Sequence, residues 1–167
     1  LAFEYARARM EPAPGWLIDT LRLSRKLFPE APDHKLETLC EVLELDEGVH
    51  HRALPDAVWC WKVLEACIER IGPGGVGAFV AEPVQGAGGV IIPPASYWPE
   101  IQRICDRYGI LLMADEVQTG FGRTGPMFAS EAEGVTPDLM TIAKGLTSGY
   151  VPMGCVMLSD RIYQAIA

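Results

Sequence analysis

The stretch that decides the fold is residues 110–118, ILLMADEVQ, in which five apolar residues end in a carboxylate. A short apolar run without helical spacing predicts a buried strand. Similar runs occur at 76–81 and 139–143. Between the first two runs, residues 99–108 carry apolar side chains at helical spacing, and Gly109 follows as a C-terminal stop. Strands that alternate with helices predict a mostly parallel sheet with helices on its faces.

An ionisable residue stands at the end of each of these runs: Glu82, Asp115 and Lys144. Ligands of open parallel sheets bind beyond the carboxyl ends of the strands, so we expect the three groups on one rim. A lysine amine can hold an aldehyde cofactor as a Schiff base, and a carboxylate can keep a pyridine nitrogen protonated. The pattern therefore indicates a pyridoxal phosphate (PLP) site. A plain salt bridge between Lys144 and Asp115 is the alternative.

The composition excludes several classes of protein. The 167 residues carry a net charge of −8, which argues against a broad basic surface for nucleic acid. No apolar run approaches the length of a membrane span, so we expect no membrane partner. The five cysteines form no CxxC pair, which is typical of buried thiols in a reducing compartment and predicts a cytoplasmic protein.

The first 72 residues differ from the rest, because they hold all three histidines and only three of the 17 glycines. Apolar spacing in this part predicts a strand at 16–20 that runs into a helix ending near residue 28. Further helices are predicted at 34–43 and up to about residue 71. Three helices and one strand suit a piece of an α/β domain better than a helical bundle.

One chemical candidate lies in this part, the pair His51 and Asp56. An aspartate in the first turn of a helix and a histidine just before it can point into one cleft. The aspartate would bind a divalent metal while the histidine takes a proton from water. In the alternative interpretation, Asp56 favours the helix N-terminus and His51 lies in a solvated loop.

Three stretches of this part carry a resemblance: WLIDTLRLSRKLFP at 16–29, HKLETL at 34–39 and HRALPDA at 51–57. They resemble the C-terminal half of the DEDDh 3′–5′ exonucleases of the DNA polymerase III epsilon type. The resemblance implies a catalytic His51, a metal-binding Asp56, Mg or Mn as the metal, and nucleic acid as substrate. The other acidic motifs of that family are not found here. One carboxylate and one histidine cannot hold two metal ions, so we expect this part alone to be inactive.

Four stretches of the second part carry another resemblance: FVAEPVQGAGG at 79–89, ADEVQTGFGRTG at 114–125, TPD at 136–138 and AKGLTSGYVPMG at 143–154. They resemble the class III (omega) aminotransferases, which are PLP enzymes of fold type I. The resemblance covers about residues 68–167. It implies a homodimeric transaminase that moves an amino group from an amine or amino acid donor to a carbonyl acceptor.

The same resemblance implies roles for individual residues of the predicted rim. By family, Lys144 holds PLP as a Schiff base, and Asp115 pairs with the nitrogen of the cofactor ring. Val117 packs against one face of the ring, and Gln118 lies near its phenolic oxygen. Glu82 lies beside the substrate-facing side of the pocket. No resident metal is implied.

Together these observations predict a chimera-like chain with two incomplete segments. We expect an exonuclease-like segment at 1–70, mainly helical, and an aminotransferase large-domain segment at 71–167, with the join somewhere within 64–76. The predicted fold class is α/β, with a partial, mostly parallel sheet of the PLP fold type I large domain. A fourth strand is predicted at 155–158, before a helix that begins at residue 160. A non-catalytic α/β scaffold is the third possibility.

Overall fold

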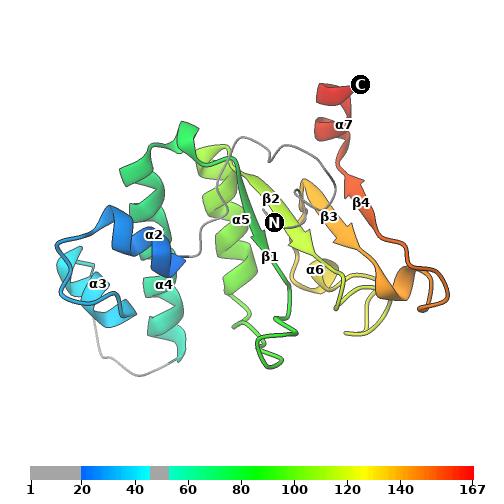
Figure 1. The fold of residues 1–167 in the computed structure, drawn as a ribbon, viewed down its shortest axis with the longest axis horizontal. Coiled ribbons are helices and arrows are strands. Elements are labelled where there is room, and N and C mark those ends of the chain that lie inside the picture. The colour runs from blue at the N-terminus through cyan, green and yellow to red at the C-terminus, as the bar shows by residue number, and fades with distance from the viewer. Residues whose placement is uncertain (1–19, 46–52) are drawn as a thin grey trace.

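The computed structural model describes residues 20–45 and 53–167. Helices lead the chain, and strands and helices then alternate (Figure 1). The elements in chain order are α2 (Thr20–Leu27), α3 (Leu36–Val42), α4 (Ala53–Ile71), the 3₁₀ turn η1 (Pro73–Gly75), β1 (Ala78–Ala81), α5 (Tyr97–Tyr108), β2 (Leu111–Asp115), α6 (Ala129–Ala132), β3 (Leu139–Ile142), the 3₁₀ turn η2 (Lys144–Leu146), β4 (Cys155–Leu158) and α7 (Asp160–Ile166).

The four strands form one sheet in the order β1-β2-β3-β4. Strand β2 pairs in parallel with both β1 and β3, whereas β4 returns antiparallel to β3. The prediction of a mostly parallel α/β sheet is therefore confirmed. The connection from β3 to β4, residues 143–154, contains only the η2 turn and no α-helix of the kind that usually joins parallel strands.

Helix α5 packs against β2 on one face of the sheet, and α4 packs against α5. Leu112 and Ala114 of β2 are fully buried on this face, and Trp98 of α5 packs into the same cluster with no exposed surface. A second cluster joins α2 and α3 to the other side of α4, around Phe28 and Cys67. Helix α4 thus packs both against the N-terminal helices and against the sheet layer (Figure 1).

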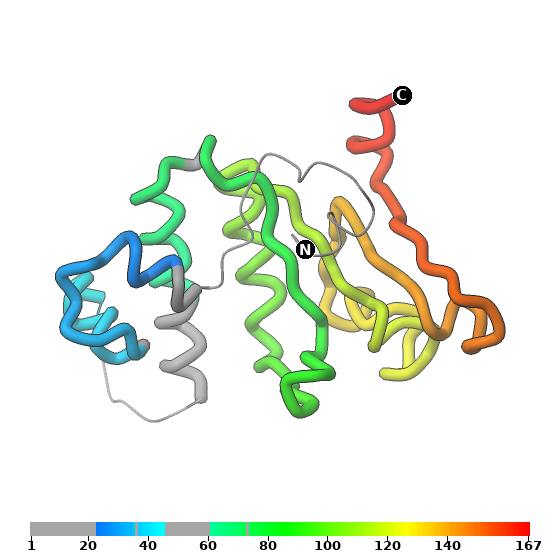
Figure 2. Tube along the Cα trace, viewed as in Figure 1, coloured from blue at the N-terminus to red at the C-terminus, as the bar shows by residue number. Residues whose placement is uncertain are grey.

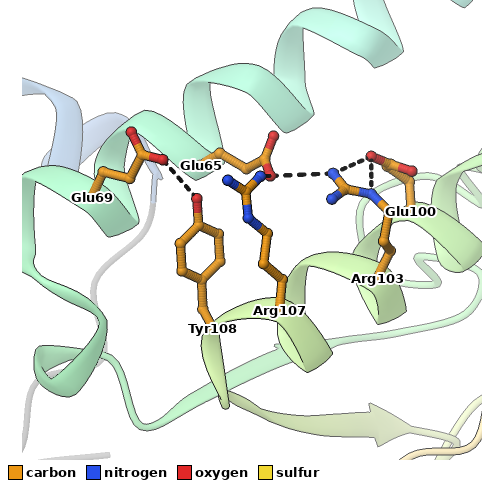
Figure 3. Close-up of polar contacts among 6 residues, drawn as sticks. All are labelled: Glu65, Glu69, Glu100, Arg103, Arg107 and Tyr108. Atoms are coloured by element: carbon orange, nitrogen blue, oxygen red, sulfur yellow. Dashed lines mark hydrogen bonds and ion pairs between the residues drawn. The ribbon is translucent and has the colours of Figure 1, made fainter.

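A polar network on the outside joins α4 to α5, and we call it the α4–α5 clamp (Figure 3). Glu65 accepts hydrogen bonds from Arg103 at 3.1 Å and from Arg107 at 3.0 Å. The hydroxyl of Tyr108 donates to Glu69 at 2.7 Å. Both glutamates come from α4 and their partners come from α5, so the clamp links the outer sides of the two helices.

Several predicted boundaries need correction. Helix α5 begins at Tyr97, two residues before the predicted start, because a proline at position 99 then falls in the first turn, where no backbone partner is lost. Strand β3 ends at Ile142 rather than at residue 143, because Lys144 has a φ of +41° and cannot continue a strand. Strand β1 begins at Ala78, since glycine at 77 favours a strand weakly.

The predictions on cysteines hold in part. Cys40, Cys67 and Cys105 are buried, and the cysteines in the described part of the chain form no disulfide. Cys155 is exposed, contrary to the expectation, because it lies on β4, the edge strand, whose four residues are all exposed. The helices in this part of the chain include none that is long and apolar enough to cross a membrane.

The predicted strand at 16–20 lies outside the described residues except for Thr20, which begins α2. The predicted join at 64–76 falls on the second half of α4 and on η1. One continuous helix therefore serves both predicted segments. The boundary between them stays a prediction.

Candidate functional site

The carboxyl ends of β1, β2 and β3 meet at one edge of the sheet. In the register, Ala81 pairs with Ala114, and Asp115 pairs with Thr141. Figure 1 shows the arrows of these strands pointing toward the lower part of the view, and Figure 2 shows the loops that follow them there. Glu82, Asp115 and the η2 turn thus share the edge that the apolar runs predicted.

Asp115 is the last residue of β2 and is half-buried. Side chains alternate along a strand, so Asp115 projects from the face opposite Leu112 and Ala114, away from α5. Its Oδ1 accepts a hydrogen bond from the backbone N–H of Val117 at 3.0 Å. Its Oδ2 has no hydrogen-bond partner among the described residues. This oxygen is therefore available to an external donor.

Glu82 and Gln118 approach each other around Gly86. The backbone N–H of Gly86 donates to Oε2 of Glu82 at 2.9 Å. A Cβ atom placed on Gly86 would lie 3.1 Å from Cγ of Gln118 and 3.4 Å from Oε2 of Glu82. The loops that follow β1 and β2 are therefore in van der Waals contact, and a larger residue at position 86 would push them apart.

Lys144 opens η2, and its side chain is exposed. A φ of +41° is uncommon for a residue with a Cβ and costs on the order of 1 kcal/mol or more. Within the described ranges, which include both residues, no ion pair joins Lys144 to Asp115. The salt-bridge alternative is thus wrong for this structure, because the turn carries the lysine past the strand end with its amine open to solvent.

One residue of this edge was missed by the sequence prediction. Glu116 is 0 % exposed. Its Oε1 accepts from the N–H of Ser130 at 2.7 Å, and its Oε2 accepts from the N–H of Ala129 at 3.1 Å and from the hydroxyl of Thr119. A signal was present in the sequence, because the alternation that buries positions 112 and 114 places 116 on the same side.

The side chains of the exonuclease-type pair lie outside the part of the chain that the structure describes. His51 lies outside the described residues, and of Asp56 only the place in α4 is described. The described residues also contain no group of three or more His, Cys, Asp or Glu side chains that could hold a metal ion.

Comparison with known proteins decides the family. The family model described as Aminotransferase class-III matches residues 38–167, most of the chain. The chain belongs to the class III aminotransferases. The model described as Exonuclease matches residues 3–64, so the two matches overlap over 38–64. Both predicted resemblances are thereby confirmed.

Relatives and solved structures agree with this family. A putrescine–pyruvate aminotransferase of Pseudomonas aeruginosa is 56 % identical over 109 residues, which cover 65 % of this chain and 24 % of the relative. An (S)-enantioselective omega-transaminase of Thermomicrobium roseum is 50 % identical with a TM-score of 0.67, covering 70 % of this chain and 26 % of that one. An amine transaminase of an uncultivated Pseudomonas species, solved in its PLP-bound form, is 50 % identical with a TM-score of 0.67, covering 69 % and 26 %. The chain thus spans about a quarter of the length of the proteins that it matches.

Proposed function

We propose that this chain is part of a PLP-dependent aminotransferase that moves an amino group from an amine or amino acid donor to a carbonyl acceptor, with Lys144 as the residue that holds the cofactor. The observation that supports it best is the shared edge of the three strand ends, where Asp115 ends β2 and Lys144 opens the turn that follows the neighbouring parallel strand β3. Family membership and a relative solved in a PLP-bound form point to the same cofactor.

The residues present fit this cofactor. The Lys144 side chain is exposed and forms no hydrogen bond or ion pair among the described residues, so its amine is open to an aldehyde. One carboxylate oxygen of Asp115 has no donor among the described residues, so it can accept a hydrogen bond from a protonated ring nitrogen. Beside Asp115 in the register, Oγ1 of Thr141 is buried without a hydrogen-bond partner in the described part of the chain.

PLP, when bound, supplies an aldehyde that condenses with amines and a ring that accepts electrons from the bond being broken. Asp115 would hold a proton at the ring nitrogen and so favour that flow of electrons. The Lys144 amine, once displaced by the donor, would remove the proton from the carbon that bears the nitrogen and return it on the cofactor side. Val117 would pack on one ring face, Gln118 would lie near the phenolic oxygen, and Glu82 would face the substrate.

The partners follow from this chemistry. We expect a small-molecule amine donor and a carbonyl acceptor as substrates, and a cytoplasmic homodimer as the working form. The described residues leave large apolar side chains exposed on β4 and on the loop before it, including Val151, Met153 and Val156, each at about half exposure or more. Such surface suits burial against further protein.

The test is addition of PLP and then a primary amine to the purified chain. We expect a yellow absorbance that disappears as the amine is added, with release of the matching carbonyl compound. Lys144→Ala should show neither change. Lys35→Ala, which removes an exposed lysine that pairs with Asp33, is the control and should behave as the wild type. A Lys144→Ala chain that still turns yellow and releases product would refute the proposal.

A second function is supported by the match of residues 3–64 to the Exonuclease family. Under this alternative, His51 and Asp56 take part in metal-dependent removal of nucleotides from a 3′ end. The test is release of nucleotides from single-stranded DNA in the presence of Mg²⁺ or Mn²⁺. Release that is lost in both His51→Ala and Asp56→Ala would support it, and no release from the wild-type chain would exclude it.

A further inference from the structure

The positive φ of Lys144 requires contacts that stabilise this backbone conformation. Residues at positive φ persist only where the surrounding structure determines their conformation. In the described residues three local hydrogen bonds close the turn, from Leu146 N–H to the Ala143 carbonyl at 2.9 Å, from Thr147 N–H to the Lys144 carbonyl at 3.4 Å and from Ser148 N–H to the Gly145 carbonyl at 3.3 Å. This short turn supplies little of the constraint, so a neighbouring element must supply the rest.

The neighbour is Phe121, from the loop after β2. A Cβ atom placed on Gly145 would lie 2.7 Å from Cβ and 2.8 Å from Cδ2 of Phe121, closer than real Cβ atoms approach. The aromatic side chain therefore rests directly on the backbone next to Lys144. Phe121 is itself strained, with a φ of +62°. The described chain has five non-glycine residues with positive φ. One of them, Phe121, makes this contact, and another, Lys144, is the residue before Gly145 on the other side.

The loop that carries Phe121 is closed on itself. The N–H of Phe121 donates to the carbonyl of Met127 at 2.7 Å, and its ring meets the ring of Phe128 edge-on at 5.7 Å. The residue before it is Gly120, where a Cβ would lie 2.9 Å from the carbonyl oxygen of Glu116. The path of this loop is therefore fixed at both ends, and each end depends on Glu116.

We propose that Glu116 is a positioning residue for Lys144: its buried carboxylate ties the start of the 116–130 loop to Ala129 and Ser130, so that Phe121 is pressed against Gly145 and the lysine backbone is held beside Asp115. This proposal rests on the proposed function, because the position of Lys144 has a consequence only if that lysine holds the cofactor. No residue of this chain of contacts other than Lys144 needs to touch the cofactor.

The carboxylate is the group that this role requires. All three of its partners donate, so both oxygens must accept. Glutamine has the same shape, but its NH₂ group would replace one of the two oxygens. In one orientation it would face the N–H of Ser130. In the other it would face the N–H of Ala129 and the hydroxyl of Thr119. A buried donor left without an acceptor is costly, so the loop would open at that end.

The experiment compares wild type with Glu116→Gln by amide hydrogen exchange of the full chain without cofactor. We expect the amides of Leu146 and Thr147, far from residue 116 in sequence, to exchange about tenfold faster or more, together with the amides of Ala129 and Ser130. Glu131→Gln is the matched control, because this exposed glutamate makes the same chemical change in the same segment. It should leave all four amides unchanged.

The second readout is the yield of borohydride-trapped PLP on Lys144, measured against the other three lysines of the same sample. We expect Glu116→Gln to lower the share on Lys144 about tenfold, whereas a purely structural role would leave that share unchanged in the folded chain. Unchanged exchange at Leu146 and Thr147, or faster exchange with an unchanged share on Lys144, would overturn the proposal.

Failure of the proposed function is separable from failure of this inference. A wild-type chain without label on Lys144 refutes the function, and the exchange data on the cofactor-free chain still decide the coupling. If Glu116→Gln does not fold, Phe121→Ala tests the next contact. It should speed exchange at Leu146 and Thr147 and leave Ala129 and Ser130 protected. Wild-type exchange at the turn in Phe121→Ala would overturn the proposal.

Discussion

Two glutamates organise two regions of this molecule in opposite ways. At the strand-end edge, Glu116 has no exposed surface and accepts from two backbone amides and one hydroxyl. On the α4–α5 clamp, the side chain of Glu65 is 19 % exposed and accepts from Arg103 and Arg107, whose side chains are 46 % and 55 % exposed. The first carboxylate fixes backbone, whereas the second joins flexible side chains.

The two carboxylates differ in how strictly they fix the geometry around them. An exposed ion pair is screened by water and salt and spends side-chain entropy, so it contributes little. Hydrogen bonds that the Arg103 guanidinium donates to the carboxylates of Glu100 and Glu65 raise its pKa, and it stays charged in any case. A buried carboxylate with every acceptor used is costly to disturb and holds one geometry. The edge that carries Asp115 and Lys144 uses a buried carboxylate of this kind, that of Glu116.

The largest expected effect is on the chemistry of the edge, through Asp115→Asn. The amide keeps the shape but cannot stabilise a positive charge at the ring nitrogen. We expect the rate of proton removal from the donor to fall by several orders of magnitude while the cofactor still attaches to Lys144. Stopped-flow absorbance after addition of an amine measures this rate.

The control for that variant is Asp106→Asn, at an exposed aspartate of α5 that bonds Gln102. It makes the same chemical change on the helical side of the molecule and should leave the rate unchanged. An Asp115→Asn rate within about tenfold of wild type, a barrier change of only about 1.4 kcal/mol, would contradict the role of Asp115.

Alkaline pH should destabilise the chain through two buried thiols of the helical region. Burial raises the pKa of the Cys67 thiol, and of the Cys105 thiol with help from the charges of Asp106 and Asp138, from 9.0 to about 11. The folded chain then keeps protons that the unfolded chain has already lost. The free energy of unfolding should therefore fall as the pH rises from about 9 to about 11.

Urea denaturation across this pH range measures the fall. A Cys155→Ser variant should show the same fall, because that cysteine is exposed. The double variant Cys67→Ala/Cys105→Ala should be less stable near neutral pH and lose most of the fall. A double variant with an unchanged pH dependence would show that other groups cause it.

A smaller effect is expected where the loop after β2 contacts the turn after β3. Gly145→Ala places a methyl group 2.7 Å from Cβ of Phe121, and we expect the free energy of unfolding to fall by about 1–3 kcal/mol. The double variant Gly145→Ala/Phe121→Gly should recover part of the loss, which a double-mutant cycle measures. Gly74→Ala is the control, because a Cβ there meets nothing within 4 Å. Equal stability of Gly145→Ala and Gly74→Ala would show that the contact is loose.

The smallest effect is expected at the clamp. Glu65→Gln should lower the free energy of unfolding by less than about 1 kcal/mol at low salt, and the difference should shrink as salt is added. Chemical denaturation at two salt concentrations measures it, with Glu131→Gln as the control. A loss above about 2 kcal/mol that salt does not change would contradict the comparison between the two regions.

Much of the sheet could be predicted because short apolar runs and their closing residues are local signals. The runs that end at Glu82, Asp115 and Lys144 predicted the three strands and the edge at which they end, and the motifs around these residues predicted the family. Glu116 could not be predicted with the same ease, because acidic residues are rarely buried and its two backbone partners lie thirteen and fourteen residues away. The contact of Phe121 with Gly145 is likewise a product of tertiary packing, which residue spacing does not encode.

The most direct test of the central claim is borohydride reduction of the wild-type chain with PLP, followed by peptide mapping. The chain has four lysines, Lys26, Lys35, Lys62 and Lys144, so the label has few places to go. If the strand ends form a cofactor site, the label will be found on Lys144 and not on the other three. Label spread over all four lysines, or found mainly on Lys26 and Lys35, would show that the strand-end edge does not select its lysine and would contradict the account.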